Sequence, residues 1–177
     1  MDHVSIIEDD LSDEEILYLY SVSNVLVSPS RGEGFGLPIA EAMFLNIPVI
    51  TTAWGGQKDY CDNDNSWLID YDYQYSKSHF DLSSSVWAEP SQQDLTRLLK
   101  EIRSLSEDDI RKKTDLAKIT IQNRYFWNNV AQKNLNFAKS LLRKSSSSTK
   151  SKIGWVSTWG TKCGIASYSK NLIKKMT

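Results

Sequence analysis

Short apolar runs alternate with amphipathic stretches along the first half of the chain. Residues 25–27 form a β-branched apolar run, short enough to be a buried central strand of a parallel sheet. Residues 48–52 and 66–69 repeat the strand pattern, with a Gly-Gly turn between them. Residues 37–45 suit a helix that tolerates Pro38 in its first turn and ends at Asn46. This alternation predicts an α/β fold with right-handed βαβ units. Its ligand crevice is expected beyond the carboxyl ends of the strands.

The flanking segments extend the pattern on both sides. Residues 4–7 are a short apolar strand candidate, and Ser12 with Glu15 can cap a helix over 13–21. From Ser91 onward the chain is expected to be helical, because its apolar residues recur at helical spacing: Leu95, Leu98, Leu99 and Ile102. Two more helices are predicted over 107–123 and 127–143, so the sheet should carry a helical carboxy-terminal half.

The end of this helical half is marked by a change in composition. Residues 144–152 contain no apolar side chain and are expected to form a flexible Ser/Lys-rich linker. Residues 152–157 then begin like another strand, and 167–174 read as a helix. We therefore divide the chain into a first domain over 1–143, the linker, and the beginning of a further domain over 153–177.

The composition of the chain indicates a folded protein and gives no sign of nucleic-acid binding or of a zinc or disulfide framework. A hydrophobic fraction of 40% and six Trp residues describe a chain that folds rather than a disordered one. A formal net charge of −1 provides no overall field for nucleic acid or an anionic membrane, so no nucleic-acid partner is expected. Cys61 and Cys163 are too far apart in sequence for a zinc or disulfide framework, which favours a cytoplasmic location. Membrane association is left open.

A glycine-rich loop lies between the first central strand and the following helix. Gly34, Phe35 and Gly36 precede a helix start, where free amides and the positive end of the helix dipole form a seat for phosphate. Glu33 and Glu41 flank this turn, one in the loop and one about a turn inside the helix. A carboxylate accepts hydrogen bonds from sugar hydroxyls. The segment therefore predicts a site for a ligand with both phosphate and sugar groups.

The sequence EGFGLPIAE at 33–41 closely resembles the E-x7-E motif of the retaining glycosyltransferases of family 4, also called group 1. The similarity continues through the stretches 48–50, 55–56, 65–68, 87–90 and 125–130, so it covers about residues 4 to 143. That family has the GT-B fold of two Rossmann-like domains. The resemblance identifies residues 1–143 as part of the carboxy-terminal, donor-binding domain.

The resemblance implies roles for the residues that match the motif. Glu33 would be the catalytic residue at the donor sugar, Glu41 would bind the ribose, and the amides of Gly34–Gly36 would bind the phosphate. Leu37 belongs to the same donor-binding set, and Gly55 and Gly56 would form a donor-sugar loop. The family transfers a sugar from a nucleotide sugar to an acceptor hydroxyl, commonly without a metal, so no cofactor is expected. The acceptor would be a glycan or a lipid-linked glycan, as in polysaccharide biosynthesis.

Two departures from the family pattern affect these expectations. The segment with the Arg and Lys that pair with the diphosphate is not found upstream, and neither is the acceptor-binding domain. A helix terminus contributes about 0.3–2 kcal/mol to anion binding, whereas micromolar affinity needs about 8 kcal/mol. We expect weak donor binding and no sugar transfer by residues 1–177 alone, with the acceptor held by the missing domain. Residues 157–166 resemble the start of a second such transferase.

Two alternative functions fit the same residues. The chain could be an inactive module that only binds a nucleotide sugar or another protein. A nucleotide-sugar 2-epimerase is a further alternative, because those enzymes share the two-domain fold and the crevice.

Asp62-Asn63-Asp64 resembles a metal-binding DxD motif. Its position between a Gly-Gly turn and a strand instead favours a tight turn.

Overall fold

The computed structural model describes residues 4–77, 84–142 and 164–176. Its contacts divide the chain into two compact units, Met1–Ile119 and Thr120–Thr177. The predicted linker and the strand expected at 152–157 lie outside the described residues. Among the described residues, no helix is both long enough and apolar enough to cross a membrane.

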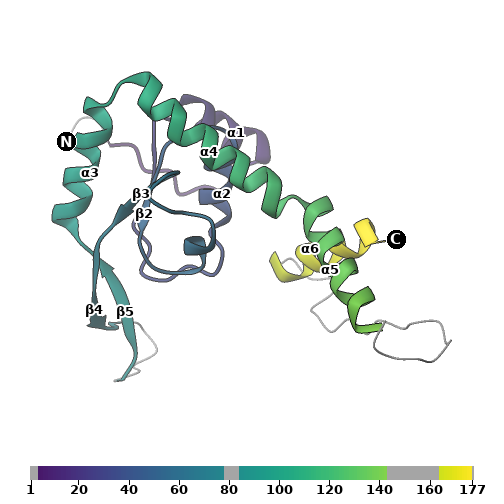
Figure 1. Cartoon of the computed structure of the whole chain (residues 1–177). Coiled ribbons are helices and arrows are strands. Elements are labelled where there is room, and N and C mark those ends of the chain that lie inside the picture. The colour runs from purple at the N-terminus through teal and green to yellow at the C-terminus, as the bar shows by residue number, and fades with distance from the viewer. Residues whose placement is uncertain (1–3, 78–83, 143–163, 177) are drawn as a thin grey trace. The chain divides into compact units, whose positions relative to one another are not determined.

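A three-stranded parallel sheet forms the centre of the first unit (Figure 1). The strands are β1 (Leu26–Ser28), β2 (Val49–Thr52) and β3 (Trp67–Ile69), in the order β1-β2-β3. Ile50 pairs with Val27 on one side and with Trp67 on the other. All four residues of β2 are buried, as expected for a central strand covered on both faces. The predicted parallel α/β sheet is confirmed.

Helices α2 (Leu37–Phe44) and α3 (Gln92–Ser104) pack against this sheet. Helix α1 (Asp13–Val22) contacts α2 through Tyr20, and Ile110 of α4 (Glu107–Tyr125) packs against the core cluster. The predicted cap of α1 is present, since Ser12 and Glu15 exchange side-chain and backbone hydrogen bonds. Leu98 and Ile102 of α3 join the buried core cluster, whereas Leu99 is 40% exposed. Helix α2 ends before Asn46, as the sequence predicted, and Asn46 has a left-handed backbone with a φ of 61°.

An antiparallel hairpin that the sequence did not predict follows β3. Its strands are β4 (Tyr71–Tyr75) and β5 (Val86–Pro90), and Tyr73 pairs with Ala88. The hairpin extends away from the parallel sheet (Figure 1). Most of β4 is exposed and only Ala88 of β5 is buried, so the hairpin lacks the buried run by which the central strands were recognised.

The strand predicted over residues 4–7 is wrong. These residues have no regular structure, and Val4 and Ile6 are 78% and 80% exposed. A strand needs a neighbour to complete its hydrogen bonds. In the described part of the chain, the parallel sheet consists of β1, β2 and β3, and residues 4–7 pair with none of these strands. An apolar sequence alone therefore did not make these residues a strand.

The second unit is helical in its described part. It contains α5 (Trp127–Leu142) and α6 (Gly164–Met176), which confirm the helices predicted at 127–143 and 167–174. The two helices contact each other, and the rings of Trp127 and Tyr168 lie 5.1 Å apart. Leu172 of α6 is fully buried.

Candidate functional site

Two loops meet at the carboxyl ends of the parallel strands. One follows β1 and contains Glu33 and Gly34, and the other follows β2 and contains Gly55 and Gly56. The amide of Gly56 donates to the carbonyl oxygen of Glu33 over 2.7 Å. A Cβ atom on Gly56 would lie 1.9 Å from the carbonyl oxygen of Gly34, so only glycine permits this approach. The loops therefore contact each other through their backbones.

Tyr60 stabilises the turn into α2 through hydrogen bonds and ring packing. Its buried hydroxyl lies 2.5 Å from the carbonyl oxygen of Phe35 and 2.9 Å from that of Gly36. The rings of Tyr60 and Phe35 pack with their centroids 5.1 Å apart. Gly36 has a φ of 82° and precedes the helix without a side-chain cap. The glycine turn thus has a fixed shape and leads into a helix start that no side chain caps, which suits an incoming anion.

Glu33 borders a cavity of about 570 Å³ at this end of the sheet. Its Oε1 accepts a hydrogen bond of 3.2 Å from the amide of Gly34. The cavity lies among residues from the β1 loop, the β2 loop and the start of the hairpin: Gly32, Glu33, Ala53, Trp54, Gly55, Lys58 and Tyr71. Its volume is within the range of small-molecule sites. Of the residues predicted from the sequence, Glu33 and Gly55 line it.

Glu41 lies elsewhere on α2 and contacts α1. Its Oε2 accepts a hydrogen bond of 3.0 Å from the hydroxyl of Tyr20, which also lies 3.2 Å from the carbonyl oxygen of Pro38. Burial raises the pKa of the Tyr20 phenol, and the adjacent Glu41 carboxylate raises it further. Glu41 and Leu37 are both exposed at the surface of α2, outside the lining of the Glu33 cavity.

Arg31, in the glycine-rich loop after β1, pairs with the hairpin. Its Nε and Nη2 donate to the carboxylate of Glu89 over 2.5 and 2.7 Å, and its guanidinium lies 4.6 Å from the ring centre of Trp87. The hydrogen bond from Arg31 holds the pKa of Glu89 below its ordinary value. Glu89 and Trp87 belong to β5, so this contact ties the hairpin to the glycine loop.

Five residues of the cavity were not predicted from the sequence: Gly32, Ala53, Trp54, Lys58 and Tyr71. Trp54 and Lys58 flank the Gly55-Gly56 pair, and Tyr71 begins the unpredicted hairpin. Buried Gln57 shapes their loop, because its Nε2 donates to the carbonyl oxygens of Trp54 over 2.7 Å and Thr52 over 3.1 Å. The proximity of Trp54 and Lys58 to the glycine pair was the only sequence signal available. Lys58 is the one cationic side chain among the cavity-lining residues in the described part of the chain.

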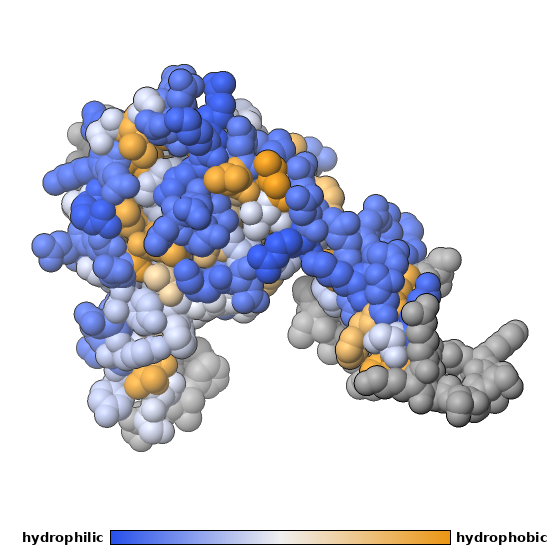
Figure 2. Space-filling model, in the orientation of Figure 1, coloured by the Kyte–Doolittle hydropathy of each residue, from blue (hydrophilic) through white to orange (hydrophobic). Residues whose placement is uncertain are grey.

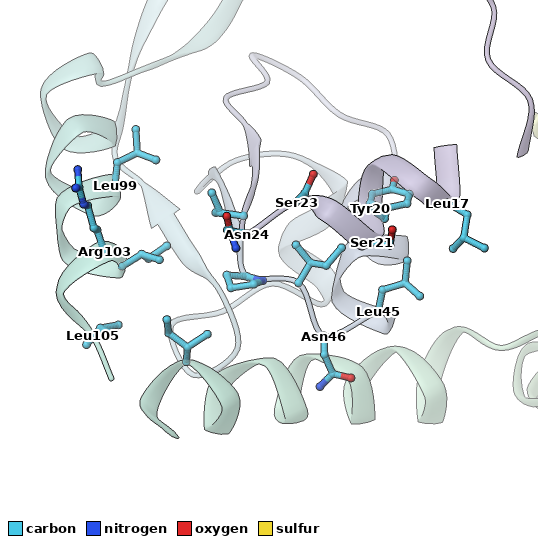
Figure 3. Close-up of a pocket in the computed structure, with 15 residues that line it drawn as sticks. Leu17, Tyr20, Ser21, Ser23, Asn24, Leu45, Asn46, Leu99, Arg103 and Leu105 are labelled. Atoms are coloured by element: carbon cyan, nitrogen blue, oxygen red, sulfur yellow. The ribbon is translucent and has the colours of Figure 1, made fainter. Parts of the chain in front are cut away.

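A larger cavity, about 820 Å³, lies at the opposite end of the same sheet (Figure 3). Residues that precede the strands line it, including Val25 before β1 and Pro48 before β2. Its other lining includes Leu17 of α1 and Leu99 of α3, together with apolar residues from the loop after α2 and from α4. Ligands of parallel α/β sheets bind beyond the carboxyl ends of the strands. We therefore take the Glu33 cavity as the candidate site despite its smaller volume.

The segment Asp62–Asp64 forms the tight turn that the sequence predicted. One carboxylate oxygen of Asp62 accepts from the amides of Asp64 over 2.9 Å and Asn65 over 3.1 Å. The side chain of Asn65 accepts in return from the amide of Asp62 over 3.0 Å. These side chains cap the entry to β3.

Comparison with known proteins gives matches in the same region. Residues 2–78 match the family described as glycosyl transferases group 1. The O-antigen chain mannosyltransferase B of Escherichia coli is 53% identical over 38 residues, which are 22% of this chain and 10% of that protein. The serotype-specific mannosyltransferase WbdA of Escherichia coli is 49% identical over 41 residues, which are 23% of this chain and 5% of that protein.

Solved structures agree with the sequence matches. A glycosyltransferase from Rickettsia africae ESF-5 superposes with a TM-score of 0.56 and 26% identity, covering 75% of this chain and 31% of that one. Sucrose-phosphate synthase from Thermosynechococcus elongatus, at 23% identity and a TM-score of 0.53, shares the fold over 81% of this chain and 31% of its own. This chain thus spans a small part of the relatives it matches. Residues 2–78 thus match the group 1 glycosyltransferase family, and the parallel α/β sheet resembles the fold of a solved glycosyltransferase.

Proposed function

We propose that this chain carries the nucleotide-sugar donor site of a retaining glycosyltransferase that works in polysaccharide biosynthesis. The observation that carries the proposal is the backbone contact between the two glycine loops, which places the Glu33 carboxylate beside a cavity at the carboxyl ends of the strands. In this proposal the complete enzyme moves a sugar from the donor to an acceptor hydroxyl.

Each part of the site has a role in holding the donor. The Glu33 carboxylate accepts hydrogen bonds from hydroxyls of the donor sugar, and Gly55 and Gly56 form the loop beneath that sugar. The uncapped start of α2 and the ammonium of Lys58 face the phosphates. Both place positive charge where negative charge grows as the sugar leaves the diphosphate, and such preorganised charge lowers the barrier of the transfer step.

Glu41 has the second role in this proposal, as a hydrogen-bond acceptor for the ribose hydroxyls. Tyr20 of α1 already holds one of its carboxylate oxygens through a 3.0 Å hydrogen bond. The other oxygen is then available to a ribose. The donor would extend from the Glu33 cavity past the start of α2 towards Glu41.

The identity of the sugar is a separate part of the proposal. Two relatives with short matches are named mannosyltransferases. We therefore propose mannose as the first sugar to test, carried by a nucleoside diphosphate.

The proposal is tested by calorimetric titration of GDP, UDP, ADP and their hexose conjugates into the purified chain. We expect saturable binding of one nucleotide family at up to millimolar ligand, and its loss in Glu41→Ala. Glu14→Ala, which removes an exposed carboxylate of α1, is the matched control and should bind as the unmodified protein does. Equal binding by Glu41→Ala and Glu14→Ala would refute the ribose contact. No binding of any nucleotide by the unmodified chain would contradict the donor site.

A further inference from the structure

An aromatic face runs along one side of the β4–β5 hairpin. Tyr71, Tyr73 and Tyr75 alternate along β4 and therefore point to the same side of the strand. Trp54 packs against the first two, with its ring centre 5.7 Å from that of Tyr71 and 5.3 Å from that of Tyr73. Tyr71 and Tyr73 are themselves 5.5 Å apart. Trp54, Tyr71 and Tyr73 are thus in mutual contact, and Tyr75 extends this aromatic row along the same side of β4.

The row is open to solvent. Trp54 is 41% exposed, Tyr73 57% and Tyr75 73%. The residues opposite Tyr73 and Tyr75 on β5 are the smaller Ala88 and Val86. In Figure 2 the surface of the hairpin is mainly pale, whereas the helical surface above it is mainly blue. The hairpin thus presents a surface of intermediate polarity that includes exposed tyrosine and tryptophan side chains.

The other side of the hairpin is anchored to the site. Trp87 and Glu89 alternate on β5 with Val86 and Ala88 and so point away from the aromatic row. There they contact Arg31 of the glycine loop through an ion pair and a cation–π contact. This contact fixes one face of the hairpin and leaves the opposite, aromatic face accessible to a ligand. A row of rings on an anchored strand loses little conformational freedom when a ligand binds.

The aromatic row is continuous with the Glu33 cavity. Trp54 and Tyr71 line that cavity, and Tyr73 and Tyr75 lead away from it along β4. Four residue steps from Tyr71 to Tyr75 span about 13 Å of extended strand, which is longer than one sugar ring. A ligand that begins beside Glu33 and continues along the row must therefore be a chain of several units.

The chemistry of the row selects the kind of chain. Its side chains are neutral and offer flat apolar rings together with hydroxyls that both donate and accept hydrogen bonds. A neutral sugar has the matching surface, because one face of its ring is made of C–H groups and its rim of hydroxyls. We propose that Trp54, Tyr71, Tyr73 and Tyr75 bind a neutral oligosaccharide. If the proposed transferase function holds, it is the part of the acceptor chain that extends beyond the acceptor-binding domain expected from the family resemblance.

The proposal is tested by titrating a neutral α-mannose oligosaccharide into the full chain, with saturation-transfer NMR to identify the sugar protons in contact with protein. Tyr73→Ala is expected to weaken binding by about tenfold, since it removes the apolar contact of one ring. Tyr73→Phe keeps the ring and is expected to retain most of the affinity. Tyr18→Ala, which removes a 65% exposed tyrosine of α1, should leave binding unchanged.

The outcomes separate this proposal from the donor site. Thermal melting of each variant first checks that it folds. Equal affinity for Tyr73→Ala and the unmodified chain, or an equal loss in Tyr18→Ala, would overturn the aromatic surface, as would no oligosaccharide binding at all. Nucleotide sugars are titrated in parallel. Nucleotide binding without oligosaccharide binding would leave the donor site standing and reject this inference. The reverse result would support the surface and reject the donor site.

Discussion

Gly56→Ala is expected to force apart the two loops that form the candidate site. The added Cβ atom would lie 1.9 Å from the carbonyl oxygen of Gly34, about 1.5 Å short of ordinary contact. The obstacle is backbone, so no rotamer change relieves it. Movement of the loops would also break the 2.7 Å hydrogen bond from Gly56 to Glu33. Overpacking costs about 1–3 kcal/mol and the lost hydrogen bond about 1 kcal/mol, so the free energy of unfolding should fall by about 2–4 kcal/mol.

Thermal and urea unfolding measure this loss. With about 2–4 °C of melting temperature per kcal/mol for a chain of this length, Gly56→Ala should melt roughly 5–15 °C lower. Gly34→Ala and Gly32→Ala are matched controls in the facing loop, because an added Cβ at either position has no neighbour within 4 Å. Both should melt within about 1 kcal/mol of the unmodified chain. A Gly56→Ala protein as stable as these controls would refute the backbone contact between the loops.

Three further predictions concern the support of the site. Tyr60→Phe should lower the free energy of unfolding by about 1–3 kcal/mol in urea titrations, because it removes a buried donor to two loop carbonyls; an unchanged midpoint would contradict that role. The lowered pKa of Glu89 means that its pairing with Arg31 stabilises the fold above the ordinary carboxyl pKa and stops doing so as the pH falls through the lowered value. The melting difference between the unmodified chain and Glu89→Gln should therefore shrink below about pH 4, and a constant difference would count against the pair. Burial raises the pKa of Cys61 to about 12, so in a Cys163→Ser background the folded chain should react with a thiol reagent at pH 8 about a thousandfold more slowly than the urea-unfolded chain. Similar rates would show that this thiol is accessible.

The parallel sheet could be predicted because its signal is local. Each central strand is short and contains β-branched residues, and burial of β2 on both faces leaves no charged residue in Val49–Thr52. The hairpin has no such signal, since its tyrosines alternate with polar residues and stay exposed. Its anchor joins Arg31 to Glu89 across 58 residues, a distance at which no local pattern applies.

The residues of the candidate site also fall into two groups, those that a local motif predicts and those that only tertiary contacts bring to the cavity. Glu33 and the glycine turn were recognised from one contiguous motif, and the structure places Glu33 and Gly55 at one cavity. Trp54, Lys58 and Tyr71 reach that cavity through loop closure and through the hairpin, which depend on tertiary contacts. Residues 4–7 show the opposite case, because their apolar sequence predicted a strand that had no described neighbour to pair with. The roles of Glu33 and Glu41 towards a donor stay predictions.

The central claim is that Glu33 contacts the sugar of a nucleotide-sugar donor. The most direct test compares two ligands, a nucleoside diphosphate and its hexose conjugate, on the unmodified chain and on Glu33→Gln by calorimetry. Glutamine keeps the size of the side chain and removes its charge, so we expect Glu33→Gln to bind the bare nucleotide normally and the sugar conjugate about tenfold more weakly. An equal affinity of both proteins for the sugar conjugate would contradict the claim.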